Sequence, residues 1–444
     1  MTDLLITGGT LINEGTRTHE DILIRNGRIE SIGSNLQVPS SCKIIEAEGK
    51  WVLPGLIDDQ VHFREPGLTH KACIHTESQA AVAGGVTTYF EMPNVSPPTL
   101  DMERIEEKCA IASRDSLANY GFFLGASNEN LEAVKSADPA RIAGVKVFMG
   151  SSTGNMLVDE ETVLEGIFRN APTIIATHCE DTPMILANEE DARNKYGDEV
   201  PFAEHGNIRS REACLKSSSM AVELAKRENA KLHVLHITTE EELDLFESGH
   251  DRITAEACVH HLWFEDSSYA TLGSQIKCNP AIKKVSDRDA VRRAVMDGRI
   301  SILATDHAPH TWEEKQGTYF NAPSGLPLIQ HSLLLMMEMC QQNGFSPELI
   351  VERACHAPAR LFQVKDRGYL REGYWADIVV VDPEGKTPVK DTELFSKCGW
   401  SPFSHLTFTH SIETTIVSGK VAYHQGQLQM DCRGQRAQFC KDRR

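Results

Sequence analysis

Three histidines and an aspartate stand at the ends of short apolar runs, and their side chains could together bind a divalent metal ion. His62 closes the run LIDDQVH, His178 closes TIIATH, His236 closes LHVLH and Asp306 closes SILATD. Taken singly, His178 and His236 are equally well explained as hydrogen-bonded core residues, and His62 alone reads as an ordinary histidine until its place before Arg-Glu-Pro-Gly is considered. Imidazole nitrogens and carboxylates are, however, the usual ligands of catalytic zinc. The set therefore predicts a metal-assisted hydrolase in which Asp306 also relays a proton.

Lys146 stands in a fifth such run, within the segment GVKVFMG. An ammonium group beside prospective metal ions would be repelled by them. Two interpretations stay open at this point. The side chain either reaches out to solvent as an ordinary ammonium, or its neutral amine takes up carbon dioxide and forms a carbamate that can bridge two metal ions. The residues alone favour the first interpretation.

These side chains need elements that bring the ends of distant strands together. Short apolar or β-branched runs alternate with helix-like segments through the middle of the chain. The runs are Leu56–His62, Val86–Glu91, Tyr120–Leu124, Val145–Met149, Thr173–His178, Leu232–Ile237, Arg252–Glu256 and Ser301–Asp306, and the helix-like segments include Thr76–Ala83, Met102–Leu117, Ser219–Glu228 and Asp287–Met296. Eight strands with helices between them are typical of a TIM (β/α)8 barrel, whose catalytic groups lie at the carboxyl ends of the strands. An open doubly wound sheet is the alternative, but no glycine-rich phosphate loop follows the first strand.

The two ends of the chain differ from the middle, because both read as short strands joined by turns. We therefore expect an α/β protein in which residues 53–364 form the barrel. Residues 1–52 and 365–444 are expected to build one small β-sandwich domain together. Two polar stretches, Ala187–Ser210 and Gly317–Leu326, are expected to be long loops at the active face of the barrel.

Composition argues against several classes of function. The formal net charge of -18 disfavours a protein that binds nucleic acid or an anionic membrane. No stretch reads as a secretory signal or is apolar enough to span a bilayer. The 12 cysteines are scattered without regular spacing, which is typical of reduced thiols. We expect a cytoplasmic protein that acts on a small molecule, with no nucleic-acid or membrane partner.

The order of several motifs resembles the class I dihydroorotases of the amidohydrolase superfamily. The motifs are PGLID, VHFREPG, EMPN, GVKVFMGSSTG, THCED, LHIT, CNPAIK, ATDHAPH and APSGLP, between about Trp51 and Arg360. The resemblance implies a homodimeric enzyme that interconverts dihydroorotate and N-carbamoyl-aspartate in pyrimidine biosynthesis. Relatives with the same barrel act as allantoinases, hydantoinases or dihydropyrimidinases, so these activities are the alternatives.

The resemblance also implies which residues bind metal. His62 and Asp306 are the implied ligands of a first ion, and Asp306 is also the implied catalytic acid and base. His178 and His236 are the implied ligands of a second ion. A carboxylated Lys146 is implied to bridge the two, which replaces the solvent-exposed interpretation of this lysine. The expected cofactors are thus one or two zinc ions, with carbon dioxide held as the carbamate.

A further set of residues is implied to hold or line the substrate. Its members are His62, Arg64, Asn94, Asn279, His310, Ser324 and Gly325. Dihydroorotate carries a ring carboxylate, and a planar guanidinium can pair with a carboxylate through two parallel hydrogen bonds. Substrates without that carboxylate give no reason for an arginine here. Arg64 therefore favours dihydroorotate over the alternative cyclic amides.

One position departs from the family's pattern. The first strand of the family ends in His-x-His, whereas this chain has Gln60-Val61-His62. A glutamine amide is a weak ligand for zinc. Gln60 is thus a doubtful ligand, and three outcomes are open. The protein could bind two ions, with Gln60 as a poor ligand or a hydrogen-bonding neighbour, or a single ion held by Lys146, His178 and His236. It could also be a homologue without catalysis that serves as a binding or assembly partner. We favour a working enzyme because Arg64 and the other substrate residues are present.

Overall fold

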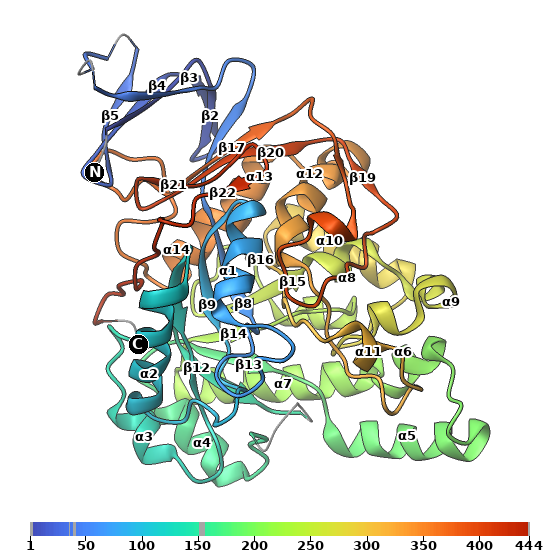
Figure 1. Cartoon of the computed structure of the whole chain (residues 1–444). Coiled ribbons are helices and arrows are strands. Elements are labelled where there is room, and N and C mark those ends of the chain that lie inside the picture. Colours follow the sequence, from blue (N-terminus) through green and yellow to red (C-terminus); the bar gives the residue numbers. More distant parts are fainter. Residues whose placement is uncertain (1–2, 35, 39–40, 151–155, 443–444) are drawn as a thin grey trace.

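The apolar runs of the middle region form parallel strands in the computed structural model, which describes residues 3–34, 36–38, 41–150 and 156–442 (Figure 1). The SSTG part of the GVKVFMGSSTG motif lies outside the described residues. The strands are β8 (Leu56–Val61), β9 (Val86–Glu91), β10 (Asn119–Phe122), β11 (Leu124–Gly125), β12 (Val145–Phe148), β13 (Ile175–His178), β14 (Leu232–Val234), β15 (Ile253–Cys258) and β16 (Ile302–Ala304). The expected strands are confirmed, with small differences at their ends.

The strands form two parallel sheets in chain order, one from β8 to β10 and one from β11 to β16. The run expected as one strand over Tyr120–Leu124 is divided at Phe123, so that β10 pairs with β9 while β11 pairs with β12. At the other edge, the backbone N–H of His62 donates to the carbonyl of His307 over 2.7 Å. The α/β class is confirmed. Within the described residues the ladders do not run as one closed sheet, so closure of the barrel stays a prediction.

Helices follow most of these strands and pack on the outside of the sheets (Figure 1). They are α1 (Ile74–Ala83), α2 (Met102–Asp115), α3 (Leu131–Ser136), α4 (Glu161–Asn170), α5 (Thr182–Tyr196), α6 (His205–Ile208), α7 (Arg211–Glu228), α8 (Val259–Trp263), α9 (Tyr269–Leu272), α10 (Val285–Asp297), α11 (Trp312–Lys315), α12 (Ser332–Gln342), α13 (Pro347–Val351) and α14 (Ala357–Leu361). The helix expected from Ser219 begins earlier, at Arg211, because the Ser210 hydroxyl accepts the N–H of Ala213 as an N-cap.

The expectation of a long loop over Ala187–Ser210 is wrong. Helix α5 covers most of its first half, and α6 lies in the second half. The Asp181 side chain caps α5 by accepting the N–H of Met184. The many charged residues of α5 form its solvent face, and that face is what made the segment read as a loop. Residues 317–326, the other expected loop, contain neither helix nor strand apart from one bridge residue.

The remaining strands come from the two chain ends, and some from each end share one sheet. They are β1 (Leu4–Thr7), β2 (Thr10–Asn13), β3 (Thr16–His19), β4 (Asp21–Arg25), β5 (Arg28–Gly33), β6 (Lys43–Glu46), β7 (Trp51–Pro54), β17 (Ile378–Asp382), β18 (Thr387–Pro388), β19 (Thr407–Phe408), β20 (Ser411–Val417), β21 (Lys420–His424) and β22 (Gln427–Leu428). N-terminal β7 pairs with both N-terminal β2 and C-terminal β17 in a seven-stranded sheet. A four-stranded sheet of β5, β4, β1 and β6 shares a hydrophobic core with it.

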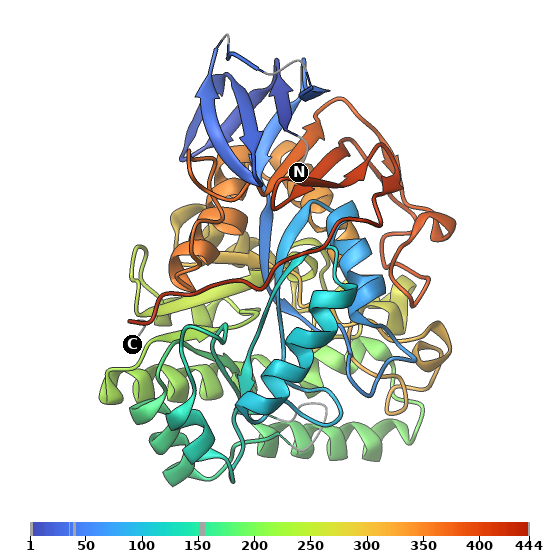
Figure 2. The same cartoon turned by 60° about the vertical axis from the view of Figure 1, so that its left-hand side comes forward.

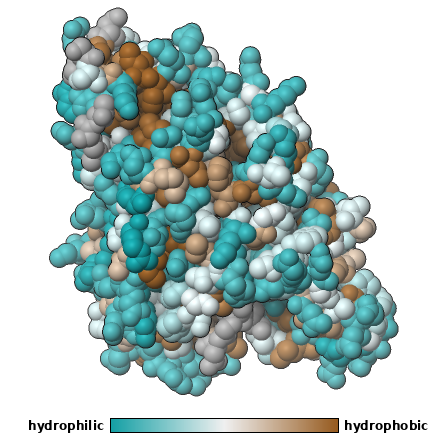
Figure 3. All heavy atoms as spheres, viewed as in Figure 1, coloured by the Kyte–Doolittle hydropathy of each residue, from teal (hydrophilic) through white to brown (hydrophobic). Residues whose placement is uncertain are grey.

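The last described residues of the chain leave these sheets and run back along the parallel strands (Figure 2). Arg436 pairs with Tyr120, and the Phe439 ring lies 5.5 Å from the ring of Phe90. The domain boundaries at residues 52 and 364 stay a prediction. On the face in Figure 3 hydrophilic side chains predominate, and apolar ones gather over the N-terminal strands. No helix among the described residues has the length and apolar character needed to cross a bilayer.

Candidate active site

The residues expected at the strand ends surround one small pocket. Its lining is Gln60, His62, Arg64, Asn94, Lys146, Phe148, His178, His236, Asn279, Asp306, Ala308, Ser324 and Gly325. Of the residues implied to bind metal or substrate, only His310 is missing from this lining, and it contacts Arg64 from behind. The free space between these side chains is about 50 Å³. The sequence therefore identified nearly all of the residues that the fold brings together.

His62 presents one ring nitrogen to Asp306. Its Nδ1 lies 2.8 Å from Asn94 Oδ1, which can only accept, so Nδ1 carries the proton. The other nitrogen, Nε2, lies 3.1 Å from Asp306 Oδ1. Burial lowers the pKa of His62 despite the neighbouring carboxylate of Asp306, which favours a neutral ring. A lone pair and a carboxylate then face each other, and this arrangement suits a cation between them.

His178 and His236 form a second pair of metal-capable side chains. Nε2 of His178 donates to Glu180 over 3.0 Å, and Arg209 pairs with the same carboxylate. Nδ1 of His178 is thereby left facing Nε2 of His236 over 3.0 Å. Burial lowers the pKa of both histidines, so both rings are neutral near pH 7. A histidine held by a carboxylate on its far nitrogen is the usual support of a metal ligand.

Lys146 is buried and lines the same pocket as these two pairs of side chains. Burial is the main cause that lowers its pKa to about 8. Its Nζ lies 4.6 Å from the centre of the Phe148 ring. An amine with this pKa is partly neutral near physiological pH, and only a neutral amine reacts with carbon dioxide. The donor set of imidazoles, a carboxylate and this lysine fits one or two zinc ions.

Gln60 occupies the position of the missing histidine. Its amide nitrogen donates to Asp306 Oδ1 over 3.2 Å, and its amide oxygen lies 3.7 Å from the sulfur of Cys258. Asp58, two residues earlier on β8, is outside the pocket lining and accepts a hydrogen bond of 2.6 Å from Thr305. Gln60 is therefore a hydrogen-bonding neighbour of a metal-capable carboxylate, and the number of metal ions stays a prediction.

One end of the pocket is cationic. The Arg64 guanidinium is buried and donates to the carbonyl of Pro309 over 3.1 Å. Burial lowers its pKa to about 10, so it keeps its charge at pH 7. His310 Nε2 lies 3.0 Å from the carbonyl of Ser324, and its Nδ1 lies 3.0 Å from the amine of Lys71. These contacts fix His310 as a neutral ring behind the guanidinium and leave Arg64 as the charge that faces the pocket.

The loop of residues 317–326 is held in place by a lysine that the sequence reading missed. Lys315 is fully buried, and its Nζ donates to the carbonyls of Pro323 and Gly325 over 2.9 and 3.0 Å. These bonds position Ser324 and Gly325 at the pocket. Glu180 was also missed, although it lies in the THCED motif two residues after His178, on the same side of an extended chain.

Three pocket residues have a left-handed backbone conformation, which is uncommon for side chains other than glycine. The φ angles are 68° at Arg64, 43° at His236 and 50° at Asp306. Such residues cost of the order of 1–3 kcal/mol each and are found mainly at functional sites. Each of these residues follows the end of its strand by two or three positions, and its side chain lines the pocket.

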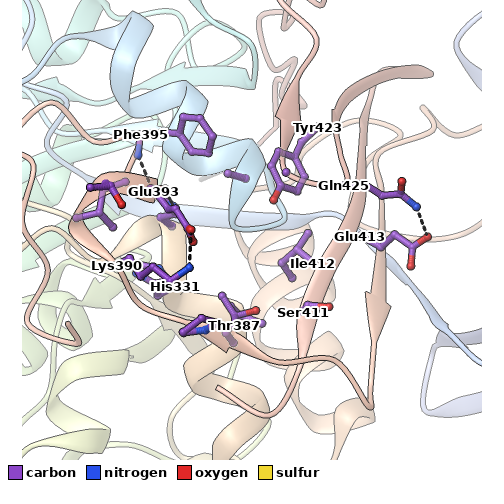
Figure 4. A pocket seen from close by; sticks show the side chains of 17 residues that line it. His331, Thr387, Lys390, Glu393, Phe395, Ser411, Ile412, Glu413, Tyr423 and Gln425 are labelled. Atoms are coloured by element: carbon purple, nitrogen blue, oxygen red, sulfur yellow. Dashed lines mark hydrogen bonds and ion pairs between the residues drawn. The ribbon is translucent and has the colours of Figure 1, made fainter. Parts of the chain in front are cut away.

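A larger cavity of about 700 Å³ lies away from these residues, between α12 and the C-terminal strands (Figure 4). His331, Glu393, Ser411 and Tyr423 are among the residues that line it. Its charges are paired, as in the 2.8 Å contact of Lys390 with Glu393. The residues expected to bind metal or substrate line the smaller pocket instead.

An α/β fold with a histidine-rich pocket at the ends of parallel strands is the architecture of a class of hydrolases. The chain belongs to the amidohydrolase family, whose sequence profile matches residues 51–422. It is 30% identical to a dihydroorotase of Methanosarcina acetivorans over 96% of this chain and 93% of that protein. It is 29% identical to an allantoinase of Bacillus velezensis over 96% of this chain and 94% of that protein. Its fold matches an L-hydantoinase of Arthrobacter aurescens with a TM-score of 0.93 and 24% identity, over 99% of this chain and 100% of that one.

Proposed function

We propose that this protein is a dihydroorotase, which reversibly hydrolyses dihydroorotate to N-carbamoyl-aspartate in pyrimidine biosynthesis. The observation that carries the proposal is the buried guanidinium of Arg64, which lines the same pocket as His62 and Asp306. The ring carboxylate of dihydroorotate is the group that such a guanidinium recognises. Allantoin, hydantoin and dihydrouracil lack this carboxylate, so the pocket suits them less well.

The proposal includes a closed (β/α)8 barrel over residues 53–364 and a β-sandwich built from residues 1–52 and 365–444. The likeness to the hydantoinase structure supports it. The parallel bridge between Val61 and His307 supports it too, because that bridge connects the first strand to the chain that follows the last strand. A homodimer is also proposed, and light scattering on the purified protein tests it.

The metal-binding part of the proposal assigns one or two zinc ions to the pocket. His62 and Asp306 would hold one, and His178 and His236 the other. A carbamate on Lys146 would bridge them. The lowered pKa of the Lys146 amine, about 8, supports this modification. When bound, zinc supplies a Lewis acid that polarises the ring carbonyl and lowers the pKa of water to ~7.

The chain's own residues perform the proton transfers and hold the substrate. Asp306 accepts the proton of the attacking water and returns it to the departing ring nitrogen. Arg64 fixes the ring by its carboxylate. Asn279 Oδ1 is buried and has no hydrogen-bond partner among the described residues, so it is available to accept an N–H of the substrate. Because ligand pockets usually exceed ~300 Å³ and the free space here is about 50 Å³, lining side chains must move to admit the ring.

A panel of cyclic amides tests the proposal. Zinc-loaded protein is assayed with dihydroorotate, allantoin, hydantoin and dihydrouracil, and with N-carbamoyl-aspartate in the reverse direction. We expect hydrolysis of dihydroorotate and its formation from N-carbamoyl-aspartate to exceed the other activities, and Asp306→Asn protein serves as the negative control. Preferred hydrolysis of allantoin, hydantoin or dihydrouracil would replace the proposal with the activity of the corresponding relative.

One observation favours a second candidate of another class. Gln60 replaces a histidine that binds metal in the resembled family, so the chain could be a homologue without catalysis that serves as a binding or assembly partner. The same panel decides between the two. Zinc-loaded protein that converts none of the substrates supports the binding partner.

A further inference from the structure

Two carboxylates and a histidine are buried together on the strands that carry the candidate site, but outside the lining of its pocket. Asp59 lies on β8, His233 on β14 and Glu256 on β15, and all three are 0% exposed. His233 Nε2 lies 3.4 Å from Asp59 Oδ2 and 3.6 Å from Glu256 Oε2. One ligand atom from each residue lies within 4.8 Å of the other two.

These polar atoms have no other partners. Both oxygens of Asp59, Oε2 of Glu256 and Nε2 of His233 make no hydrogen bond within the part of the chain that the structure describes. The separations from Nε2 exceed the usual N–H···O range of about 2.7–3.2 Å. Buried charges are normally paired, hydrogen-bonded or bound to a metal ion. His233 Nε2 is thus ion-paired with both carboxylates at separations longer than a hydrogen bond, and no other group satisfies these atoms among the described residues.

The neighbour of His233 indicates which nitrogen is free. Thr254 Oγ1 donates its only proton to the carbonyl of Leu232 over 3.3 Å. It therefore accepts a hydrogen bond from His233 Nδ1, which lies 2.8 Å away. In the neutral ring the lone pair on Nε2 then points towards Asp59 and Glu256. Two ionised carboxylates and a lone pair repel one another unless a cation lies among them, and burial, with the charge of Asp59, raises the pKa of Glu256 to about 7.

A proton and a metal ion are the two possible cations. Burial by itself lowers the pKa of His233, but Asp59 and Glu256 outweigh it and raise the pKa to about 9. A proton on Nε2 would form charge-assisted hydrogen bonds, which are usually about 2.7–2.9 Å long. Ligand atoms about 2.0–2.2 Å from a tetrahedral zinc ion are separated by about 3.3–3.6 Å. The observed separations of 3.4 and 3.6 Å match the second case.

We propose that Asp59, His233 and Glu256 bind a structural divalent metal ion, zinc by the chemistry of its ligands, which is distinct from any ion in the pocket. The bond from His233 to Thr254 is the support that a histidine ligand needs on its far nitrogen. Glu256 connects this ion to the pocket, because its other oxygen, Oε1, accepts the backbone N–H of His236 over 3.2 Å. The ion thus helps to fix the strand end that carries a pocket histidine.

Zinc content tests the proposal. The protein is produced in zinc-supplemented medium, because a fully buried site must be filled as the chain folds, and the zinc bound to the folded, dialysed protein is then measured. Asp59→Asn removes one ligand charge, and Asp58→Asn is the matched control because Asp58 lies on the same strand but bonds to Thr305. We expect Asp59→Asn to contain about one ion per chain less than the unmodified protein and Asp58→Asn to match it. Folded Asp59→Asn with an unchanged zinc content overturns the proposal.

Anomalous diffraction at the zinc edge gives an answer that needs no variant. Crystals of the unmodified protein are expected to show a peak bonded to His233 Nε2 and to oxygens of Asp59 and Glu256. A map with peaks only in the pocket rejects the site and leaves a protonated His233 between the two carboxylates. Neither measurement uses catalysis as its readout, so failure of this proposal is distinguishable from failure of the dihydroorotase assignment.

Discussion

Nδ1 of His178 and Nε2 of His236 face each other at 3.0 Å, although 58 positions separate the two residues in the chain. Glu180 accepts the proton on the far nitrogen of His178 and so keeps Nδ1 available as a ligand. The pair is arranged as half of the proposed metal site. The affinity of that site for metal is expected to depend on Glu180, which is not part of the pocket lining.

Replacement of Glu180 by glutamine should weaken metal binding. We expect the affinity for zinc to fall by about 10–100-fold, as is usual when the support of a histidine ligand is removed. A competition titration against a chromophoric chelator measures it. Glu190→Gln, at an exposed position of α5, is the control and should leave the affinity unchanged. Equal affinities in the two variants would show that Glu180 does not orient His178.

Gln60→His should restore the His-x-His pattern of the first strand. Imidazole is a better zinc ligand than an amide, so the first ion should be held more tightly. We expect the zinc content of the pocket to rise from about one to about two ions per chain. Metal analysis after identical dialysis of both proteins measures the change. If the pocket of the unmodified protein already holds two ions, Gln60 does not limit the binding of zinc at the first site.

Asp306→Asn should abolish the proton transfer with little change in shape. We expect turnover of dihydroorotate to fall by ~10²–10⁴-fold, the usual contribution of a positioned acid or base. Steady-state kinetics measures the loss, and the zinc content of the variant shows how much of it arises from a lost ligand. Asp289→Asn, a partly exposed carboxylate of α10, is the control. Turnover that stays within a few-fold of normal contradicts the assigned role.

Arg64→Ala should weaken the binding of substrates that carry a carboxylate more than the binding of uncharged ones. Charge-assisted hydrogen bonds contribute roughly 1.5–3 kcal/mol, so we expect the KM for dihydroorotate to rise by roughly 10–100-fold. Any slow hydrolysis of dihydrouracil, which has no ring carboxylate, should change much less. Arg64→Lys keeps the charge but loses the planar fork, so it should be intermediate. Unchanged KM and turnover for dihydroorotate would remove Arg64 from substrate recognition.

Protonation of His331 in mild acid should lower the free energy of unfolding. Burial lowers its pKa to about 4, well below the ordinary value of 6.5. Between these values the unfolded chain binds more protons than the folded one, so stability falls as the pH drops from 6.5 towards 4. We expect His331 to account for about 2 kcal/mol of the stability lost between pH 7 and pH 5. Urea unfolding at both pH values should show that loss in the unmodified protein and a correspondingly smaller one in His331→Phe. An identical loss in the two proteins contradicts the prediction.

Much of the candidate site could be predicted from the sequence because strand ends in a parallel sheet share one edge. His178, His236 and Asp306 each follow an apolar run, and runs of that kind become neighbouring strands. The alternation of strands and helices likewise predicted the α/β class. The sequence pattern gave a wrong prediction at α5, because the charged residues of its solvent face were taken for a loop.

Tertiary structure decided what each of these side chains can do. The free nitrogens of His62 and His178 depend on Asn94 and Glu180, and the place of Gln60 depends on Asp306. The order of residues determined by itself which chemical groups this protein carries and which strands present them. Protonation and orientation depend on contacts between residues far apart in the chain, and such contacts exist only once the strands have packed.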